Sequence, residues 1–295
     1  MSGWTAARAR RLDEIAGPDG VIVGAAVDHR DSLRAAMAKK GMPAPSDVEL
    51  SNLKVQIAAA LAPAATIVLL DAETSAAQAL AMGALPGDVA LGVPLEAQGY
   101  EDADVPVTTF LAGWSPAQAV RLGASACKLL LPYRVDEPEQ VAAQDAVVRR
   151  AVADCRAAGV ALILEPIAAK QELIVEGARR LAGFGPDVLK VQHPGSADAC
   201  QELDEACGWA VPWVLLGGGA DPETLERQVA EACAAGANGF VVGRTLWDGA
   251  LESPDTLETV SRPLLERLGA VAREHATPWR ERVGVFSAPV PGTLP

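Results

Sequence analysis

The sequence is poor in positive charge, in histidine and in aromatic side chains. Its 25 Lys and Arg residues face 38 Asp and Glu residues, which gives a formal net charge of −13 at pH 7. Affinity for nucleic acid or for an anionic membrane needs a basic surface that displaces counterions, so neither is an expected partner. The tryptophans are scattered and show no pattern for stacking on bases. An anionic ligand would therefore have to be held by a local cluster of cations.

Cysteine and histidine are also scarce, and their spacing matches no metal site. The five cysteines contain no C-x-x-C pair, and the three histidines stand far apart at positions 29, 193 and 275. We therefore expect reduced thiols and no structural zinc. Residues 1–17 lack the apolar core of a signal peptide, and nowhere do about 18 uncharged apolar residues follow one another. These absences predict a cytoplasmic protein without a membrane span, and a homo-oligomer is compatible with the sequence.

Eight short apolar runs are present, and each predicts a strand. They are nearly continuous in apolar residues rather than alternating, which is typical of a parallel sheet covered on both faces. The eight runs are VIVGAAVD (21–28), TIVLLD (66–71), VALGVPL (89–95), ACKLLLPY (126–133), VALILEP (160–166), DVLKVQHP (187–194), WVLLGGG (213–219) and GFVVGR (239–244). A further segment, VPVTTF (105–110), is a candidate for an additional strand.

Helical segments separate the runs, and their ends carry recognisable capping residues. SDVE (46–49) has the pattern of a capping box, and Ser115 and Asp221 each precede a proline that suits the first helical position. A recurring succession of helix, terminal glycine and strand indicates a repeated βα unit. Eight such units without an obvious linker favour one closed (β/α)8 TIM barrel over an open doubly wound sheet. We expect a single domain over residues 1–295, with its core at about 21–250 and with the N-terminal helix and the tail after Thr277 packed on that core.

Polar residues at the C-terminal ends of the strands are the candidates for chemistry, because (β/α)8 barrels build their active sites at that end. Two lysines and a glutamate lie within otherwise apolar runs, where a charge is costly unless it is paired or used. The candidates are Asp28, Asp71, Lys128, Glu165, Lys190, the glycines Gly217, Gly218 and Gly219, and Arg244.

Lys190 is the strongest candidate for a nucleophile. A lysine amine attacks a carbonyl only when it is neutral, and desolvation together with a nearby cation such as Lys128 favours that state. Glu165 could move protons while a covalent intermediate forms and breaks down. A salt bridge between Lys190 and Glu165 on neighbouring strands would have the same sequence pattern, so a purely structural role stays open.

The stretch LLGGGAD (215–221) after the seventh strand, with Gly243 and Arg244 after the eighth, predicts a phosphate site. Small residues expose backbone N–H groups, an arginine adds donors, and barrels commonly bind phosphate after these two strands. A glycine run alone would also fit a tight turn. Lys54, on an expected helix, is by default on a solvated face, and His29 and His193 are expected to form hydrogen bonds at strand ends.

Taken in order along the chain, several of these segments resemble the class I (β/α)8 aldolases of the tagatose-bisphosphate and sulfofructose-phosphate type. The resemblance runs from about Val21 to Trp247 and rests on AVDHRDSL, LKVQIAAALAPAATIVLLDAET, GWSPAQAVRLGASACKLLLPYR, LILEP, DVLKVQHP, WVLLGGG and GFVVGRTLW. It implies reversible retro-aldol cleavage of a ketose phosphate to dihydroxyacetone phosphate and an aldehyde, without a metal or another cofactor. The lack of a histidine cluster independently disfavours a zinc-dependent aldolase.

The resemblance also implies roles for individual residues. Lys190 matches the Schiff-base lysine and Glu165 the proton shuttle. Lys128 matches a cation that polarises the substrate, and Asp28 matches an aspartate near the hydroxyl next to the broken bond. The expected contacts with the C1 phosphate and the rest of the substrate come from Arg244, Gly217, Gly218, Gly219, Gly243, Arg30, Gln192 and Asp71.

Two positions depart from the family's usual pattern. Gly217 stands where the relatives usually have serine, which removes a hydroxyl from the phosphate site. Gln192 stands where a carboxylate is common, which removes a negative charge near Lys190. Both departures are expected to affect the choice of substrate more than the mechanism.

Three other interpretations stay open at this point. One is a deoxyribose-phosphate aldolase, which joins acetaldehyde to a triose phosphate. Another is a barrel that retains the site but only binds or senses a sugar phosphate. In the third, the four charged residues Asp28, Lys128, Glu165 and Lys190 are ion pairs of the core, which requires many buried charges without a use.

Overall fold

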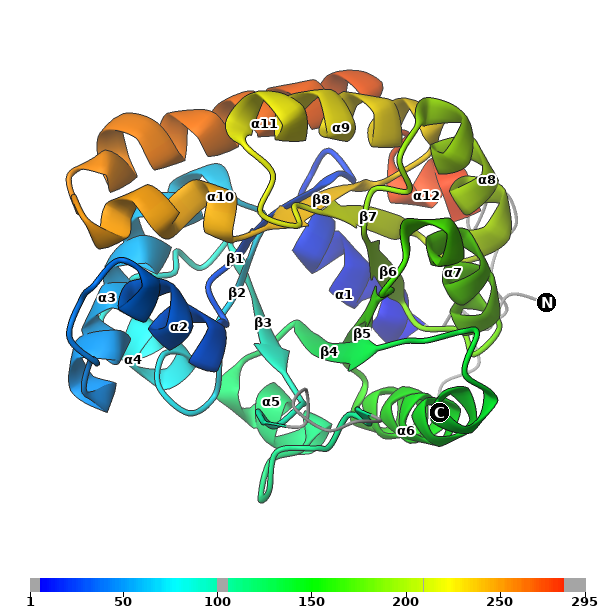
Figure 1. The fold of residues 1–295 in the computed structure, drawn as a ribbon, viewed down its shortest axis with the longest axis horizontal. Coiled ribbons are helices and arrows are strands. Elements are labelled where there is room, and N and C mark those ends of the chain that lie inside the picture. Colours follow the sequence, from blue (N-terminus) through cyan, green and yellow to red (C-terminus); the bar gives the residue numbers. More distant parts are fainter. Residues whose placement is uncertain (1–5, 100–105, 209, 284–295) are drawn as a thin grey trace.

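The computed structural model describes residues 6–99, 106–208 and 210–283, and these form a closed ring of parallel strands surrounded by helices (Figure 1). The strands follow one another in chain order, and β1 pairs with β8 in the register Ile22↔Gly239, which closes the ring. The predicted TIM barrel is therefore confirmed, and the open sheet is excluded. The strands are β1 (Ile22–Ala26), β2 (Ile67–Leu69), β3 (Ala90–Pro94), β4 (Ala126–Pro132), β5 (Ala161–Ile167), β6 (Val188–Val191), β7 (Trp213–Leu216) and β8 (Gly239–Val242).

Helices cover the outside of the ring, and the predicted capping residues are found at their ends. Ser46 forms the capping box, and the side chains of Ser115 and Asp221 accept hydrogen bonds from the backbone N–H of Gln118 and Thr224. The helices are α1 (Ala6–Ala16), α2 (Asp31–Lys39), α3 (Asp47–Leu61), α4 (Ala76–Ala81), α5 (Pro116–Leu122), α6 (Pro138–Ala158), α7 (Ile174–Ala182), α8 (Ala197–Cys207), α9 (Pro222–Ala235), α10 (Arg244–Trp247), α11 (Arg262–His275) and α12 (Trp279–Val283). None of the described helices is long and apolar enough to cross a membrane.

The apolar side chains form two cores, because successive residues of a strand point to opposite faces. One core lies inside the ring and includes Ala126, Ile163 and Val188. The other lies between the ring and the helices and includes Leu129 and Leu164. Every second residue of a strand therefore points inward, which decides which polar residues can share the interior.

Helix α1 closes the N-terminal end of the ring. Its buried side chains Leu12 and Ile15 join the inner core, and Arg8 forms an ion pair with Asp187, just before β6. Trp279 of α12 also packs into this core. In Figure 1 α1 is visible through the ring of strands. With this end filled, the opposite end, where the strands finish, is left for a site.

The expected additional strand at 105–110 is not found over residues 106–110, and residue 105 lies outside the described residues. Only Phe110 makes an isolated antiparallel bridge, with Glu96. A closed barrel has no edge strand that could receive a ninth partner, and Pro106 has no N–H to donate. The backbone N–H of Thr108 instead donates to the Gln144 side chain.

Candidate active site

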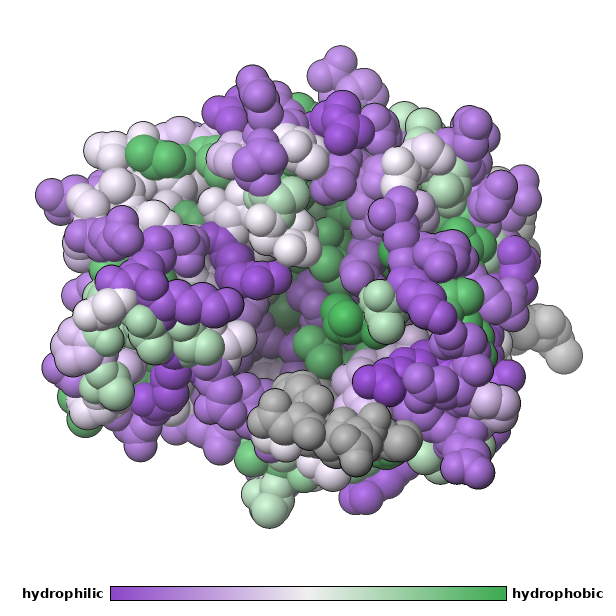
Figure 2. Space-filling view, viewed as in Figure 1, coloured by the Kyte–Doolittle hydropathy of each residue, from purple (hydrophilic) through white to green (hydrophobic). Residues whose placement is uncertain are grey.

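The C-terminal ends of the strands surround a cavity made of two adjoining parts, and Figure 2 shows a hollow at the centre of the ring. The β1–β3 part has a volume of about 470 Å³ and is lined by Asp28, Arg30, Asp31, Glu96, Gln98 and Lys128 among others. The β7–β8 part has a volume of about 380 Å³ and is lined by Gln192, Gly217, Gly218, Gly219, Gly243 and Arg244 among others. Both parts are lined by His29, Ser32, Leu130, Glu165 and Lys190. Lys190 and Glu165 therefore lie where the two parts meet.

Lys128, Glu165 and Lys190 come together because all three occupy inward positions of neighbouring strands. Each stands two residues after an inner-core residue, Ala126, Ile163 and Val188 respectively. Lys190 Nζ lies 2.7 Å from Glu165 Oε1, and Lys128 Nζ lies 3.4 Å from Glu165 Oε2. All three residues are at most 6% exposed, so the two ammonium groups and the carboxylate interact in a place with little water.

Three carboxylates surround the ammonium group of Lys128. Its Nζ donates to Asp28 Oδ2 at 2.9 Å and to Glu96 Oε1 at 2.6 Å, besides its contact with Glu165. Glu96 is not among the site residues expected from the sequence, although it directly follows the apolar run 89–95, where a polar residue at the end of a strand is a candidate for chemistry. Glu96 also accepts a hydrogen bond from the backbone N–H of Leu130, which fixes its carboxylate beside β4.

These contacts determine the charge states in the cavity. Burial alone would raise the pKa of Asp28, but the positive charges of Lys128 foremost and of Lys190 outweigh burial and hold the pKa well below its usual value. Burial likewise opposes ionisation of Glu165, but Lys190 and Lys128 bring its pKa below the usual value. Burial would lower the pKa of Lys128, yet the surrounding carboxylates raise it well above its usual value. Lys128 is therefore a permanent cation at neutral pH, and Asp28 and Glu165 are anions.

One oxygen of Glu165 is left without a hydrogen bond. Oε1 lies against Lys190, whereas Oε2 is buried, has no hydrogen-bond partner among the described residues and has only the ion-pair contact with Lys128 Nζ at 3.4 Å. A buried carboxylate oxygen without a hydrogen bond costs free energy, and such atoms concentrate at places where a ligand or a reacting group completes the contacts. Glu165 can therefore exchange a proton with a group that lies in the cavity beside Lys190.

The β7–β8 part has the geometry of an anion site. Gly218 and Gly219 adopt left-handed backbone conformations with φ of +57° and +82°, which glycine allows without strain. Arg244 is exposed, and its guanidinium donates to the carbonyl of Gly218 at 3.2 Å. The guanidinium therefore lies over the turn, and Gly218, Gly219 and Arg244 line the same end of the cavity, where a guanidinium and the backbone of a glycine turn suit an anion.

Gly217 contributes only backbone to this part of the cavity. A Cβ added to it would lie 3.0 Å from Val242 Cγ1 and 3.7 Å from Leu225 Cδ1, between β8 and α9. A serine on this backbone would thus point away from the cavity. The expected loss of a hydroxyl from the phosphate site does not follow from glycine at this position.

Gln192 and His29 border the reacting groups. The side-chain oxygen of Gln192 accepts a hydrogen bond from the backbone N–H of Ala168 at 2.7 Å, so it ties the end of β6 to the end of β5. His29 packs edge-on against Trp247, with ring centroids 5.1 Å apart. Burial lowers the pKa of His29 to about 4, with Asp28 opposing the shift. His29 is therefore neutral at physiological pH.

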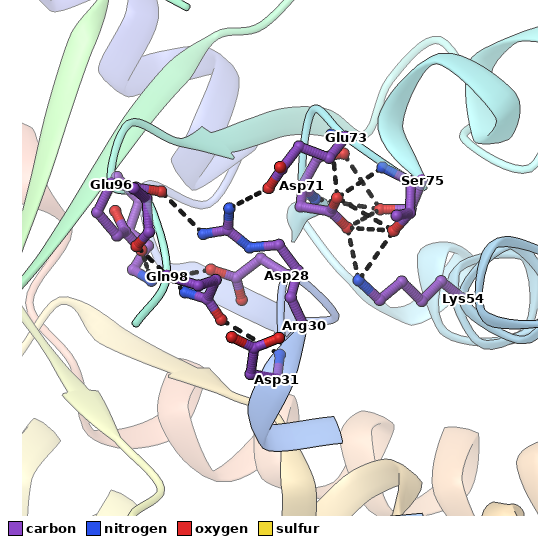
Figure 3. Close-up of polar contacts among 12 residues, drawn as sticks. Asp28, Arg30, Asp31, Lys54, Asp71, Glu73, Ser75, Glu96 and Gln98 are labelled. Carbon is purple, nitrogen blue, oxygen red and sulfur yellow. Dashed lines mark hydrogen bonds and ion pairs between the residues drawn. The ribbon is translucent and has the colours of Figure 1, made fainter. Parts of the chain in front are cut away.

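Asp71 and Lys54 lie behind the cavity wall rather than in it. Both side chains are fully buried, Lys54 Nζ donates to Asp71 Oδ2 at 2.6 Å, and Thr74 and Ser75 complete the contacts (Figure 3). The expectation that Asp71 contacts substrate does not fit this position. The expectation that Lys54 is solvated is wrong, because α3 turns this residue toward β2, where its ammonium pairs with the carboxylate of Asp71. Burial lowers the pKa of Lys54, and the contact with Asp71 opposes this shift.

Arg30 lines the β1–β3 part but is already engaged by the protein. One terminal nitrogen pairs with Glu73, and the other donates to the backbone carbonyl of Glu96 at 2.9 Å (Figure 3). The guanidinium thereby links the ends of β1, β2 and β3. The structure thus brings every predicted site residue except Asp71 to the cavity, and no group of His, Cys, Asp or Glu in the described part of the chain is arranged to hold a metal ion.

The chain is similar to known aldolases both in sequence and in fold. The sequence profile of a family described as DeoC/LacD family aldolase matches residues 22–249. The tagatose 1,6-diphosphate aldolase of Staphylococcus aureus (strain JH9) is 27% identical over 318 residues, which cover 92% of this chain and 97% of that protein.

Two solved structures share the fold at low sequence identity. An archaeal fructose 1,6-bisphosphate aldolase is 19% identical with a TM-score of 0.64, covering 90% of this chain and 99% of that chain. The fructose-bisphosphate aldolase from Slackia heliotrinireducens is 15% identical with a TM-score of 0.66, covering 91% of this chain and 90% of that chain.

Proposed function

The chain belongs to the DeoC/LacD family of aldolases, and we propose that it is a class I aldolase in which Lys190 forms an imine with a ketose phosphate. The reaction is reversible cleavage to dihydroxyacetone phosphate and an aldehyde. The observation that carries the proposal is the contact of Lys190 with Glu165, 2.7 Å between Nζ and Oε1, at the junction of the two parts of the cavity.

Glu165 serves the formation of the imine. Glu165 takes a proton from the ammonium of Lys190, and the neutral amine adds to the ketone carbon C2 while Glu165 returns this proton to the carbonyl oxygen, which becomes the hydroxyl of a carbinolamine. Glu165 then takes the second proton from nitrogen and gives it to the hydroxyl, which leaves as water, so that the protonated imine forms and Glu165 is again an anion. Its Oε2, which has no hydrogen-bond partner among the described residues and lies 3.4 Å from Lys128 Nζ, can accept a hydrogen bond from the reacting group.

Asp28 serves the cleavage of the bond between C3 and C4. The protonated imine withdraws the electron pair of this bond, while a base takes the proton of the C4 hydroxyl, so that the aldehyde leaves and an enamine remains. Asp28 is a buried anion that lines the β1–β3 part, 2.9 Å from the ammonium of Lys128. Protonation of the enamine at C3 and addition of water to the imine then release dihydroxyacetone phosphate.

The β7–β8 part holds the phosphate on C1. Arg244 supplies a guanidinium, and the turn of Gly218 and Gly219 supplies backbone N–H groups. This places C2 beside Lys190 and sends C3 and C4 toward Asp28. The whole substrate thus runs from the β7–β8 part into the β1–β3 part.

A ketose phosphate is favoured over a deoxyribose phosphate as the substrate. The relative that matches 92% of this chain is a tagatose 1,6-diphosphate aldolase, and a ketose has the carbonyl at C2 that this arrangement requires. A barrel that only binds ligand is disfavoured, because binding alone gives no reason to hold two lysines and three carboxylates at high desolvation cost in one cavity.

Trapping of the imine tests the proposal. The protein is incubated with dihydroxyacetone phosphate, reduced with borohydride and digested, and the modified lysine is identified by mass spectrometry. We expect one adduct on Lys190, none in Lys190→Ala, and an unchanged adduct in Lys170→Ala, which removes an exposed lysine outside the cavity. Acetaldehyde as the trapped donor would support the deoxyribose-phosphate alternative, and no adduct with either donor would refute a class I mechanism.

A further inference from the structure

We propose that the β1–β3 part accepts an uncharged aldehyde, so that the substrate is a ketose 1-phosphate rather than a ketose bisphosphate. This inference rests on the function proposed above and concerns the half of the substrate that becomes the aldehyde. Its basis is that no cation in the β1–β3 part is available to bind a second phosphate. The arginine that lines this part, Arg30, is already paired with Glu73.

All lysine and arginine residues of the chain fall within the described residues, so the cations of the cavity can be enumerated completely. Those that line it are Arg30, Lys128, Lys190 and Arg244. Arg244 lies at the β7–β8 end, and Lys190 is the nucleophile. Lys128 is already surrounded by Asp28, Glu96 and Glu165. Among these four cations, Arg30 is thus the only one that could bind a second phosphate.

Arg30 is not available for that role. Its terminal nitrogens are directed to the carboxylate of Glu73 and to the carbonyl of Glu96, and its Nε is sealed from solvent. The backbone of Glu73 is held in place, because its N–H donates to Asp71 Oδ1 at 3.0 Å. Asp71 is in turn fixed by Lys54 (Figure 3). The guanidinium is therefore neutralised by the side chain of Glu73, which is 44% exposed and extends from a backbone that the buried Asp71 and Lys54 hold.

The remaining charges of this end are negative. Asp28, Asp31 and Glu96 line it, and Gln98 contributes a neutral amide whose oxygen accepts from the backbone N–H of Asp31 at 3.2 Å. A phosphate dianion here would meet the buried carboxylates of Asp28 and Glu96 and the exposed carboxylate of Asp31 without a free cation, which is unfavourable. Aldehyde hydroxyl groups, in contrast, can donate to these carboxylates.

The two ends of the cavity therefore differ in the charge they accept. The β7–β8 end offers an exposed guanidinium and backbone N–H groups of glycine residues, whereas the β1–β3 end offers acceptors. A substrate with one phosphate, bound at the β7–β8 end, and a polar but uncharged carbon chain, bound at the β1–β3 end, matches this difference.

Competing acceptors test the inference in the direction of synthesis. With dihydroxyacetone phosphate as the donor, kcat/KM is measured for glyceraldehyde and for glyceraldehyde 3-phosphate. We expect the uncharged acceptor to be favoured by about tenfold or more, as expected when a site leaves a charge unpaired. Equal efficiency, or a preference for the phosphorylated acceptor, would overturn the inference.

The variant Glu73→Gln tests the residue held responsible. Removing the negative charge releases Arg30, so the ratio of kcat/KM for the phosphorylated over the uncharged acceptor should rise about fivefold or more. Glu137→Gln is the matched control, because Glu137 is equally exposed and is paired with Arg134 outside the cavity; it should leave the ratio unchanged. A ratio that Glu73→Gln does not move would contradict the proposal.

The imine experiment separates the two levels of inference. An adduct on Lys190 together with a preference for the phosphorylated acceptor would overturn the assignment of the aldehyde and leave the class I mechanism in place. Absence of the adduct would remove both.

Discussion

Replacing Lys54 with methionine removes one partner of the most deeply buried ion pair described here. Lys54 and Asp71 are both fully buried, and their charged atoms lie 2.6 Å apart. Methionine has a similar length and can pack among the apolar neighbours of α3, so the variant mainly removes the positive charge. Asp71 then keeps hydrogen bonds from the backbone N–H of Glu73 and Thr74 and from the hydroxyl of Ser75.

The expected loss of stability follows from the unpaired carboxylate. Removing one partner of a buried pair costs about 3–5 kcal/mol, and the remaining hydrogen bonds of Asp71 place the estimate near the lower limit, about 3 kcal/mol. With an unfolding entropy of about 2.1 cal/mol/K per residue, a chain of this length has about 0.6 kcal/mol/K. The midpoint of thermal unfolding should therefore fall by roughly 5 °C.

The pH dependence identifies the charge as the cause. Burial would raise the pKa of Asp71, but Lys54 and the hydrogen bonds outweigh it and lower the pKa in the wild type. A carboxylate whose pKa is lowered by folding stabilises the fold at pH values above its pKa in the unfolded chain. This stabilisation is lost as the pH falls toward the pKa in the folded state. In Lys54→Met the pKa of Asp71 rises instead, so its ionised carboxylate destabilises the fold at high pH. The difference in stability between the wild type and the variant therefore becomes smaller as the pH is lowered.

Thermal unfolding followed by circular dichroism at pH 8 and pH 5 measures both effects. Lys170→Met, at an exposed ion pair, should leave the midpoint unchanged. The double variant Lys54→Met with Asp71→Asn should recover part of the loss, because no charge stays unpaired. A change below about 1 kcal/mol in Lys54→Met, or a deficit that is equal at both pH values, would refute the reasoning.

Two further predictions concern the cavity. Arg244→Gln should raise the KM for dihydroxyacetone phosphate about tenfold or more, because the guanidinium binds mainly the phosphate. The KM for unphosphorylated dihydroxyacetone should change little. Equal effects on both donors would show that Arg244 does not bind the phosphate. Lys128→Met should lower kcat/KM about a hundredfold and move the acidic limb of the pH profile upward, because Asp28 and Glu165 lose the cation that lowers their pKa values. An acidic limb that stays in place would show that neither carboxylate must be ionised for the reaction.

The sequence by itself determined the architecture and the central residues of the cavity. The eight apolar runs, separated by helices of which several begin at a capping residue, specify a parallel barrel through local preferences and burial. Lys128, Glu165 and Lys190 were identifiable because a charge within an apolar strand stands out. Their catalytic roles stay predictions until the imine experiment is done.

The tertiary structure decided what these residues contact. Arg30, Glu73 and Glu96 belong to three different loops, and only the parallel pairing of β1 with β2 and of β2 with β3 brings them within hydrogen-bonding reach. Sequence proximity carries no information about such contacts, because they depend on how strands far apart in the chain are aligned.

The same limit explains Lys54. The burial of a helical residue depends on which face of the helix packs against the barrel, and α3 is apolar around much of its circumference, so its pattern does not identify that face. The sequence therefore determined the fold and the identity of the chemical groups, whereas packing determined which charges are paired and which are free to meet a substrate.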